Sequence, residues 1–215
     1  HSATPEGLQL SVVYQPQALG LGHAVLCARE VLAAMPEGEE QTFAVMLPDD
    51  FIDAAAAAGH AGSAGCLADM VALHEATGAW SLAVEEVPRE QTDKYGVVSL
   101  TSQATDAPER MVAMVEKPKP ADAPSNLAVV GRYVLPGAIF AALAEVKPGA
   151  GGEIQLTDGI AALLASHDIR AHRFAGVRYD CGSKLGYAKA NMALALRDPV
   201  MAEPLKAWLK AEMAL

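Results

Sequence analysis

A continuous apolar run, Phe43-Ala44-Val45-Met46-Leu47, narrows the choice of fold more than any other segment of the chain. An uninterrupted run of this kind is typical of a strand buried on both faces, in a sheet that helices cover on two sides. Pro48 stops the run, and Asp49 and Asp50 follow directly. Because open α/β sheets bind ligands at the carboxyl ends of their strands, the sequence places two carboxylates where a ligand site is expected.

Strand and helix patterns alternate around this run. Residues 8–14 predict a strand, which a glycine loop and a helix from Ala24 to near Met35 follow. Apolar spacing predicts a further helix at residues 66–77, capped by Gly78. Later strands are predicted at residues 80–87, 95–100, 111–115, 127–134 and 169–174, and helices at 138–145, 153–165, 184–196 and 199–213. The alanine- and glycine-rich residues 54–65 predict a loop insertion or a weak helix.

These patterns predict an α/β fold with a mixed, mainly parallel central sheet flanked by helices. The 215 residues (22.4 kDa) are enough for one substantial domain that needs no disulfides. We therefore expect a single domain over residues 1–215, with a helical C-terminal tail at residues 184–215.

Composition excludes several classes of protein. Hydrophobic residues make up 52% and charged residues 20%, which excludes a disordered chain. We expect no membrane span, because no apolar run reaches the roughly 20 residues that one needs. The net charge is −10, from 16 Lys and Arg against 26 Asp and Glu, so nucleic acid is an improbable partner. A small phosphorylated ligand stays possible, because a few placed cations and a divalent metal can neutralise it locally.

Cysteine usage and the N-terminus bear on location. Cys27, Cys66 and Cys181 form no C-x-x-C pair, so reduced thiols in a cytoplasmic protein are expected rather than zinc sites or disulfides. The first residues lack the basic and then apolar order of a signal peptide. They also lack an initiator Met, so we expect the chain to begin part way through a longer gene product.

Two candidate binding segments lie early in the chain. Leu19-Gly20-Leu21-Gly22-His23 connects a predicted strand to a helix, where glycines let the backbone approach a ligand or simply form a tight turn. It lacks the third glycine of the dinucleotide fingerprint, which disfavours a nicotinamide cofactor. Asp49 and Asp50 are either ligands for a hard cation such as magnesium or residues of an Asx turn or helix cap.

Three further segments could contribute to a site. Glu116 and Lys117 follow a strand directly and could contact sugar hydroxyls and phosphate, or could be solvated edge charges. The glycine-rich residues 147–158 could form a ligand wall, a mobile flap or a flexible joint. Asp180 stands beside a turn that opens a helix and is either a second metal ligand or an organiser of that turn.

Taken in order, these segments resemble the bacterial UTP:glucose-1-phosphate uridylyltransferases (UDP-glucose pyrophosphorylases). The resemblance covers the chain from about Leu10 to its C-terminus, apart from the alanine- and glycine-rich stretch. It rests on the segments GLGHAVLCA (20–28), LPD (47–49), YGVV (95–98), VEKPK (115–119), APSNLAVVGRYVL (123–135), PGAGGEIQLTD (148–158) and YDCGSKLGY (179–187).

The resemblance implies a Rossmann-like nucleotide-diphospho-sugar transferase that makes UDP-glucose and pyrophosphate from UTP and glucose 1-phosphate. It also implies magnesium as cofactor and a homo-oligomer, a dimer or a tetramer. No protein nucleophile is required, since an oxygen of the sugar phosphate attacks the α-phosphorus in line. The implied roles are uracil recognition by Gln15 and Gly20, metal binding by Asp49 and Asp180, glucosyl contacts by Gly96 and Glu116, and catalytic phosphate binding by Lys117.

One departure from the family pattern is large. The family begins with a strand and a glycine-rich, arginine-containing loop that wraps the triphosphate, and this sequence has no such segment. We therefore expect an incomplete nucleotidyltransferase domain, inactive or poorly folded by itself. Two alternatives stay open: a non-catalytic paralogue or regulatory subunit of the same fold, and a nucleotidyltransferase for another sugar phosphate or nucleotide.

Overall fold

The strand around which the fold is organised is β6 (Leu127–Pro136), in a computed structural model that describes residues 8–35, 38, 41–56, 65–101 and 109–213. β6 pairs in antiparallel fashion with β1 (Thr42–Met46) on one side and β3 (Trp80–Glu86) on the other. Every position of β6 except Arg132 is buried. β6 is thus covered on both faces along its length, whereas the run at residues 43–47 is not.

β1 departs from the prediction made for that run. It lies at one end of the sheet order, and its residues Ala44 and Met46 are exposed. The predicted strand itself is confirmed, but its burial on both faces is wrong. The physical reason is that, among the described residues, β1 has a paired strand on one side alone and is covered on one face only.

The main sheet has the order β1-β6-β3-β7-β5-β4, with β7 (Ile169–Arg173), β5 (Glu109–Glu116) and β4 (Gly96–Leu100). β4 also pairs with β6. The sheet is mixed, as predicted, but "mainly parallel" is wrong for the described residues, where β3–β7 is the one parallel pair. Parallel pairing needs a long crossover, which joins β3 to β7, whereas β4 and β5 are successive strands that pair directly.

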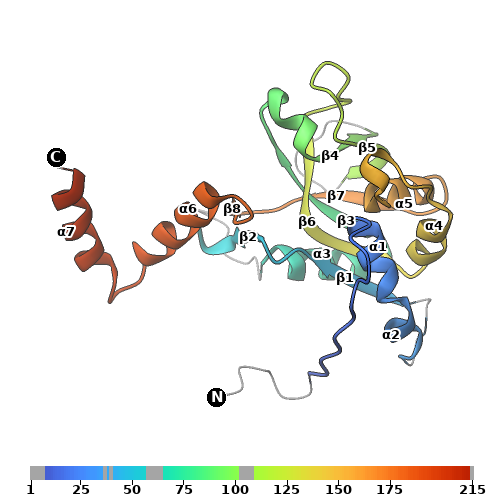
Figure 1. Ribbon diagram of the computed structural model, residues 1–215, viewed down its shortest axis with the longest axis horizontal. Helices are drawn as coiled ribbons and strands as arrows, with labels where there is room; N and C mark the ends of the chain where they lie inside the picture. The colour runs from blue at the N-terminus through green and yellow to red at the C-terminus, as the bar shows by residue number, and fades with distance from the viewer. Residues whose placement is uncertain (1–7, 36–37, 39–40, 57–64, 102–108, 214–215) are drawn as a thin grey trace.

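Helices cover both faces of the sheet (Figure 1). The larger core lies under α1 (Leu21–Cys27), α4 (Ile139–Glu145) and α5 (Leu156–Leu163), with α2 (Arg29–Ala33) continuing from α1. A smaller core on the opposite face lies under α3 (Cys66–Thr77). Cys66 is buried there, and this burial raises the pKa of its thiol to about 12.

Most predicted elements are confirmed within a few residues. The helix at residues 66–77 matches α3 at both ends, and Gly78 adopts the predicted left-handed cap with φ 72°. The strand predicted at residues 8–14 is wrong, because the described residues there pair with no strand and leave their side chains exposed. The helix predicted from residue 153 begins at Leu156. Of residues 54–65, a short 3-10 turn covers Ala54–Ala56, and residues 57–64 lie outside the described part.

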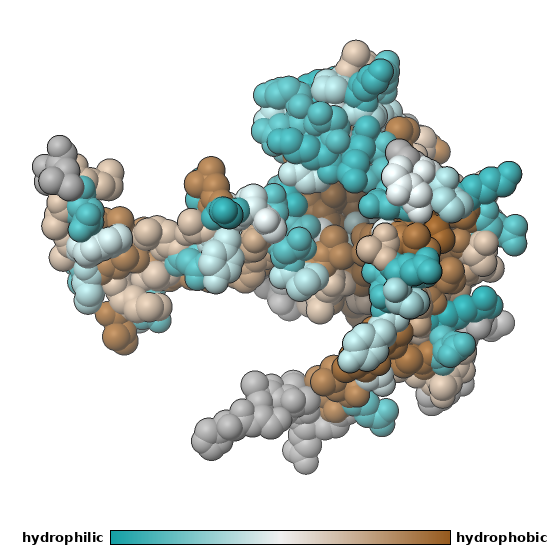
Figure 2. All heavy atoms as spheres, in the orientation of Figure 1, coloured by the Kyte–Doolittle hydropathy of each residue, from teal (hydrophilic) through white to brown (hydrophobic). Residues whose placement is uncertain are grey.

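A second, two-stranded sheet was not predicted. β2 (Asp50–Asp53) pairs in antiparallel fashion with β8 (Val177–Asp180). The predicted C-terminal helices follow as α6 (Lys184–Ala195) and α7 (Ala202–Met213), which extend away from the main sheet (Figure 1). Apolar side chains are visible along this extension in Figure 2, and α7 has no buried residue. No helix in the described ranges is both long and apolar enough to cross a bilayer.

Candidate active site

One cavity of about 470 Å³ collects most of the residues singled out from the sequence. Its size is typical of small-molecule sites. The lining includes six of the seven predicted site residues: Gly20, Asp49, Gly96, Glu116, Lys117 and Asp180. The seventh, Gln15, is not among the lining residues. Its side-chain nitrogen lies 3.0 Å from the carbonyl oxygen of Gly20 and 3.0 Å from His23 Nδ1, so it contacts the glycine loop from outside the cavity.

The two acids that follow β1 have different environments. Asp50 is buried, and its Oδ2 accepts a hydrogen bond of 2.8 Å from the backbone N–H of Gly131. Asp49 is exposed, and its carboxylate has no hydrogen bond or ion pair to any described residue. Asp50 is therefore used to hold the turn, which leaves Asp49 free to bind a ligand.

The turn that carries Asp49 is fixed to β6 by Arg132. Its guanidinium donates to the carbonyl oxygen of Leu47 at 3.1 Å and to that of Asp50 at 2.6 Å. The backbone N–H of Leu47 also donates to the carbonyl of Gly131 at 2.9 Å. Asp49 is consequently presented on a turn whose flanking backbone groups are bonded to the central strand.

β8 brings Asp180 beside Asp49. The N–H of Cys181 donates to the backbone carbonyl of Asp49 at 2.7 Å, and Asp180 pairs with Asp50 in the two-stranded sheet. A Cβ added at Gly182 would lie 2.8 Å from Asp49 Oδ2 and 3.2 Å from Asp180 Oδ1. Both carboxylates thus lie beside a position that a larger residue would fill. The N–H of Gly182 also donates to Asp180 Oδ1 at 3.1 Å, so Asp180 helps to organise this turn.

Arg178 holds Asp50, the neighbour of Asp49, in place. Its side chain is 8% exposed, forms an ion pair with Asp50, and donates to Glu85 at 2.7 Å. The guanidinium carbon also lies 5.4 Å from the centre of the Tyr95 ring. Burial alone lowers the pKa of Arg178, but the hydrogen bonds to Asp50, Tyr95 and Glu85 outweigh it and raise the pKa. We call Asp49, Asp50, Arg178 and Asp180 the acidic wall.

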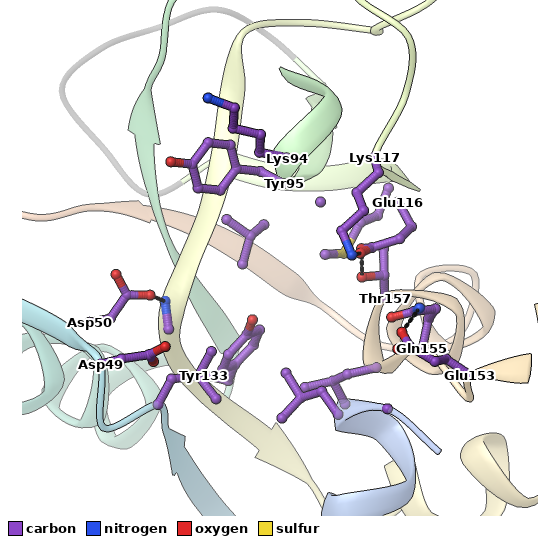
Figure 3. A pocket seen from close by; sticks show the side chains of 18 of the residues that line it. Asp49, Asp50, Lys94, Tyr95, Glu116, Lys117, Tyr133, Glu153, Gln155 and Thr157 are labelled. Atoms are coloured by element: carbon purple, nitrogen blue, oxygen red, sulfur yellow. Dashed lines mark hydrogen bonds and ion pairs between the residues drawn. The ribbon is translucent and has the colours of Figure 1, made fainter. Parts of the chain in front are cut away.

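The opposite side of the cavity is built on β4, β5 and α5 (Figure 3). Glu116 ends β5 and accepts a 2.5 Å hydrogen bond at Oε2 from Thr157 Oγ1. A Cβ added at Gly96 would lie 3.3 Å from Thr157 Oγ1 and 3.4 Å from Glu116 Oε2, so glycine leaves this corner open. We call Gly96, Glu116, Lys117 and Thr157 the Glu116 wall.

Lys117 has an unusual backbone. Its φ of 44° lies in the left-handed region, where it is the only described residue other than glycine. Such a conformation strains a residue with a Cβ, and strain of this kind clusters at functional sites. The N–H of Lys117 donates to the carbonyl of Tyr95 at 2.9 Å, which holds the turn, and its Nζ lies 3.5 Å from Glu116 Oε1.

A third part of the lining joins the glycine loop to the segment before α5. The N–H of Gly22 donates to the carbonyl oxygen of Ile154 at 2.9 Å, and the N–H of Ile154 donates to the carbonyl oxygen of Leu19 at 2.7 Å. Gln155 donates to the carboxylate of Glu153 at 2.7 Å, and both line the cavity (Figure 3). Residues 153 and 155–157 of the glycine-rich segment 147–158 thus form part of the cavity lining, and a ligand contact by this segment stays a prediction.

Several lining residues were not singled out from the sequence as site residues, among them Tyr133, Thr157 and Arg178. Tyr133 is 7% exposed, and its pKa is raised mainly by burial and further by the nearby Glu116 and Asp50. Its phenol therefore stays protonated and neutral inside the cavity. Thr157 belongs to the motif at residues 148–158 and Arg178 directly precedes the motif at residues 179–187. Their partners are distant along the chain, so spacing alone gave no signal for them.

The residues present suit a divalent metal. No group of three or more His, Cys, Asp or Glu side chains arranged for a metal is found in the described part of the chain. Asp49 and Asp180 are instead a pair of carboxylates open to the cavity. This donor set fits magnesium, which is usually bound by one or two carboxylates together with substrate phosphates.

Comparison with known proteins identifies the family. The model of the Nucleotidyl transferase family matches residues 2–197. The chain belongs to the nucleotidyl transferase family. A nucleotidyl transferase of Staphylococcus epidermidis, the UTP–glucose-1-phosphate uridylyltransferase, is 39% identical over 198 residues, which are 92% of this chain and 64% of that relative. The chain thus spans less than two thirds of the length of that relative.

Solved structures of nucleotidyl transferases are similar as well. UTP-bound UGPase from Acinetobacter baumannii superposes with a TM-score of 0.80 at 39% identity, over 96% of this chain and 67% of that one. A UDP-glucose pyrophosphorylase complexed with UDP-glucose gives a TM-score of 0.76 at 38% identity, over 87% of this chain and 66% of that one. These similarities confirm the family resemblance and the fold class inferred from the sequence motifs.

Proposed function

We propose that the protein transfers a uridylyl group from UTP to glucose 1-phosphate, giving UDP-glucose and pyrophosphate. The observation that carries the proposal is that Asp49 and Asp180, which form no ion pair with any described residue, line the same cavity as Glu116 and Lys117. Figure 3 shows Asp49 across this cavity from Glu116 and Lys117. This arrangement supplies separate groups for a metal, a sugar and a phosphate. Similarity to proteins bound to UTP and to UDP-glucose supports the choice of nucleotide and sugar.

The proposed chemistry is a displacement at phosphorus. An oxygen of the sugar phosphate attacks the α-phosphorus of UTP, a new P–O bond forms, and the bond to the bridging oxygen breaks as pyrophosphate leaves with the electron pair. The protein contributes positioning and charge neutralisation rather than a nucleophile. Lys117 acts here as the catalytic cation, because its ammonium can contact phosphate oxygens that gain charge in the transition state.

Asp49 and Asp180 would hold the magnesium ion. When bound, the metal would neutralise phosphate charge and so let two anionic substrates approach each other. Glu116 would accept hydrogen bonds from sugar hydroxyls, and Gly96 would let the sugar ring approach the backbone. Uracil would be recognised at the glycine loop by Gly20, with Gln15 adjacent to it.

Pyrophosphate release with UTP and glucose 1-phosphate tests the proposal. Lys117→Ala is expected to lower kcat on the order of 100-fold, as the loss of one group that stabilises transition-state charge does. Lys119→Ala is the matched control, because this exposed lysine lies two residues on and outside the cavity lining. Faster turnover with dTTP or another sugar phosphate than with UTP and glucose 1-phosphate would contradict the assigned substrates.

Calorimetry separates the enzyme from a non-catalytic paralogue. We expect heat of binding with UDP-glucose and magnesium, and its absence would favour an interaction module. The same purified protein tests whether the domain is incomplete, as expected from the sequence. An intact mass near 22.4 kDa together with full activity would show that no further segment is needed for activity.

We further propose that the protein assembles as a homo-oligomer through α7. This helix buries none of its residues, while Trp208 is 56% and Met213 82% exposed. Symmetric self-association would bury the same apolar stripe on each copy. Light scattering after gel filtration measures the assembly, and Trp208→Ser is expected to shift it toward the monomer without changing the fold.

A further inference from the structure

The two oxygens of the Glu116 carboxylate have different partners. Oε2 accepts the 2.5 Å hydrogen bond from Thr157 Oγ1. Oε1 is the oxygen on the side of Lys117, whose Nζ lies 3.5 Å away. Because an ionised carboxylate can only accept hydrogen bonds, the hydroxyl of Thr157 must be the donor. One oxygen of Glu116 is thus committed to the protein, and the other remains for a ligand.

Thr157 is well placed to hold that oxygen still. It is the second residue of α5, is 6% exposed, and follows the buried Leu156. Leu156 and Ile160 anchor the helix in the larger core, so the backbone at Thr157 has little freedom to move. A threonine side chain in a helix is limited to two main χ1 rotamers, and the hydrogen bond to Glu116 selects one of them. The hydroxyl therefore occupies a fixed point beside Glu116.

Without this donor Glu116 could point in several directions. Its side chain is 20% exposed, carries three rotatable bonds, and has a lysine ammonium nearby that attracts both oxygens. A carboxylate that turns freely can follow a sugar hydroxyl in either an axial or an equatorial position. A carboxylate held at Oε2 offers Oε1 from one direction only.

We propose that Thr157 is the positioning residue of the sugar site and that, by fixing Glu116, it makes the site selective for the hydroxyl configuration of the hexose 1-phosphate. This inference rests on the proposed function, because it assigns the sugar contact to Glu116. The inference adds a residue that determines sugar specificity without being a sugar contact: Thr157 in α5 need not touch the substrate, but it sets which epimer is accepted.

The test compares glucose 1-phosphate with its 4-epimer, galactose 1-phosphate, in wild type, Thr157→Val and Thr157→Ser. Thr157→Val keeps the shape but removes the donor. It should raise KM for glucose 1-phosphate about tenfold, as expected for loss of a hydrogen bond to a charged group, and leave KM for UTP unchanged. The ratio of kcat/KM for the two epimers should fall several-fold. Thr157→Ser should restore both values, and Thr101→Val, on an exposed residue outside the cavity, should change neither.

Each failure has a distinct meaning. An unchanged epimer ratio in Thr157→Val, or an equal defect in Thr157→Ser, overturns the role of Thr157 while the proposed function stands. A wild-type protein that neither turns over glucose 1-phosphate nor binds UDP-glucose overturns both. If Thr157→Val does not fold, Thr157→Cys replaces it, because a thiol of similar size is a weak donor. Calorimetry with UDP-glucose on the same variants gives a readout that does not depend on turnover.

Discussion

The two walls of the cavity are held in place by different forces. On the acidic wall, full charges are buried: Arg178 is 8% exposed and neutralises Asp50, while Asp49 and Asp180 stay open to solvent. On the Glu116 wall, a neutral hydroxyl positions one carboxylate, and a strained backbone turn presents Lys117. On both walls, the residues that fix the site in place differ from the residues that are proposed to contact the ligand.

The largest expected effect is on stability, at the acidic wall. Arg178→Ala should lower the free energy of unfolding by about 3–5 kcal/mol, because it leaves the buried carboxylate of Asp50 without its cation. Arg173→Ala is the matched control: Arg173 pairs with Glu86, which is 60% exposed, so its loss should cost about 1 kcal/mol or less. Urea unfolding measures both. Equal losses would contradict the distinction between the two pairs.

The next effect concerns activity without stability. Asp49→Asn should lower turnover at limiting magnesium on the order of 100-fold, since it removes a carboxylate proposed to bind the metal. The free energy of unfolding should stay within about 0.5 kcal/mol of wild type, because the side chain is exposed. Asp50→Asn should show the reverse order, with the stability loss dominant. A similar profile for the two variants would show that the acids share one role.

Replacing the strained Lys117 of the Glu116 wall should lower activity, while its effect on the free energy of unfolding should depend on the residue that replaces it. Lys117→Gly and Lys117→Ala should both remove the phosphate contact and lose activity alike. The free energy of unfolding should nevertheless be about 1 kcal/mol higher for Lys117→Gly than for Lys117→Ala, because only glycine adopts φ 44° without strain. Thermal unfolding of the pair measures the difference, and a more stable alanine variant would exclude strain at this position.

The smallest effect is expected at Gly182. A Cβ there would approach the carboxylate of Asp49 to 2.8 Å, and that side chain can rotate away. Gly182→Ala should therefore raise the magnesium concentration needed for half-maximal activity several-fold with little change in stability. Gly149→Ala, whose Cβ meets nothing closer than 3.8 Å, serves as control. Unchanged magnesium dependence would place the metal away from these two acids.

Sequence patterns anticipated the parts of the fold that depend on local order. Periodicity and Gly78 gave α3 to the residue, because helix hydrogen bonds and caps are local. The relative burial of β1 and β6 could not be obtained this way, since it depends on which strands become neighbours. β2 and β8 were missed for a similar reason: they are short, and each is stabilised by a partner more than a hundred residues away.

The candidate site shows the same division. Asp49, Glu116, Lys117 and Asp180 were predicted from their places at strand ends and turns, and Gly96 was implied by the family resemblance; all five line one cavity. The family resemblance already implied Asp49 rather than Asp50 as the metal ligand. The physical reason needed the structure, because Asp50 is held by Gly131 and Arg178, which are distant in the chain. Their metal, sugar and phosphate roles stay predictions that the variants above test.

The buried thiol of Cys66, the first residue of α3, has a practical consequence for following ligands at the acidic wall. Burial raises the pKa of the Cys66 thiol to about 12, so it stays protonated at neutral pH and alkylating reagents should spare it. The partly exposed Cys27 and Cys181 are then the sites open to labelling. Since Cys181 directly follows Asp180, a Cys27→Ser protein would carry a fluorescent probe at a single position, beside the carboxylates whose occupancy is in question.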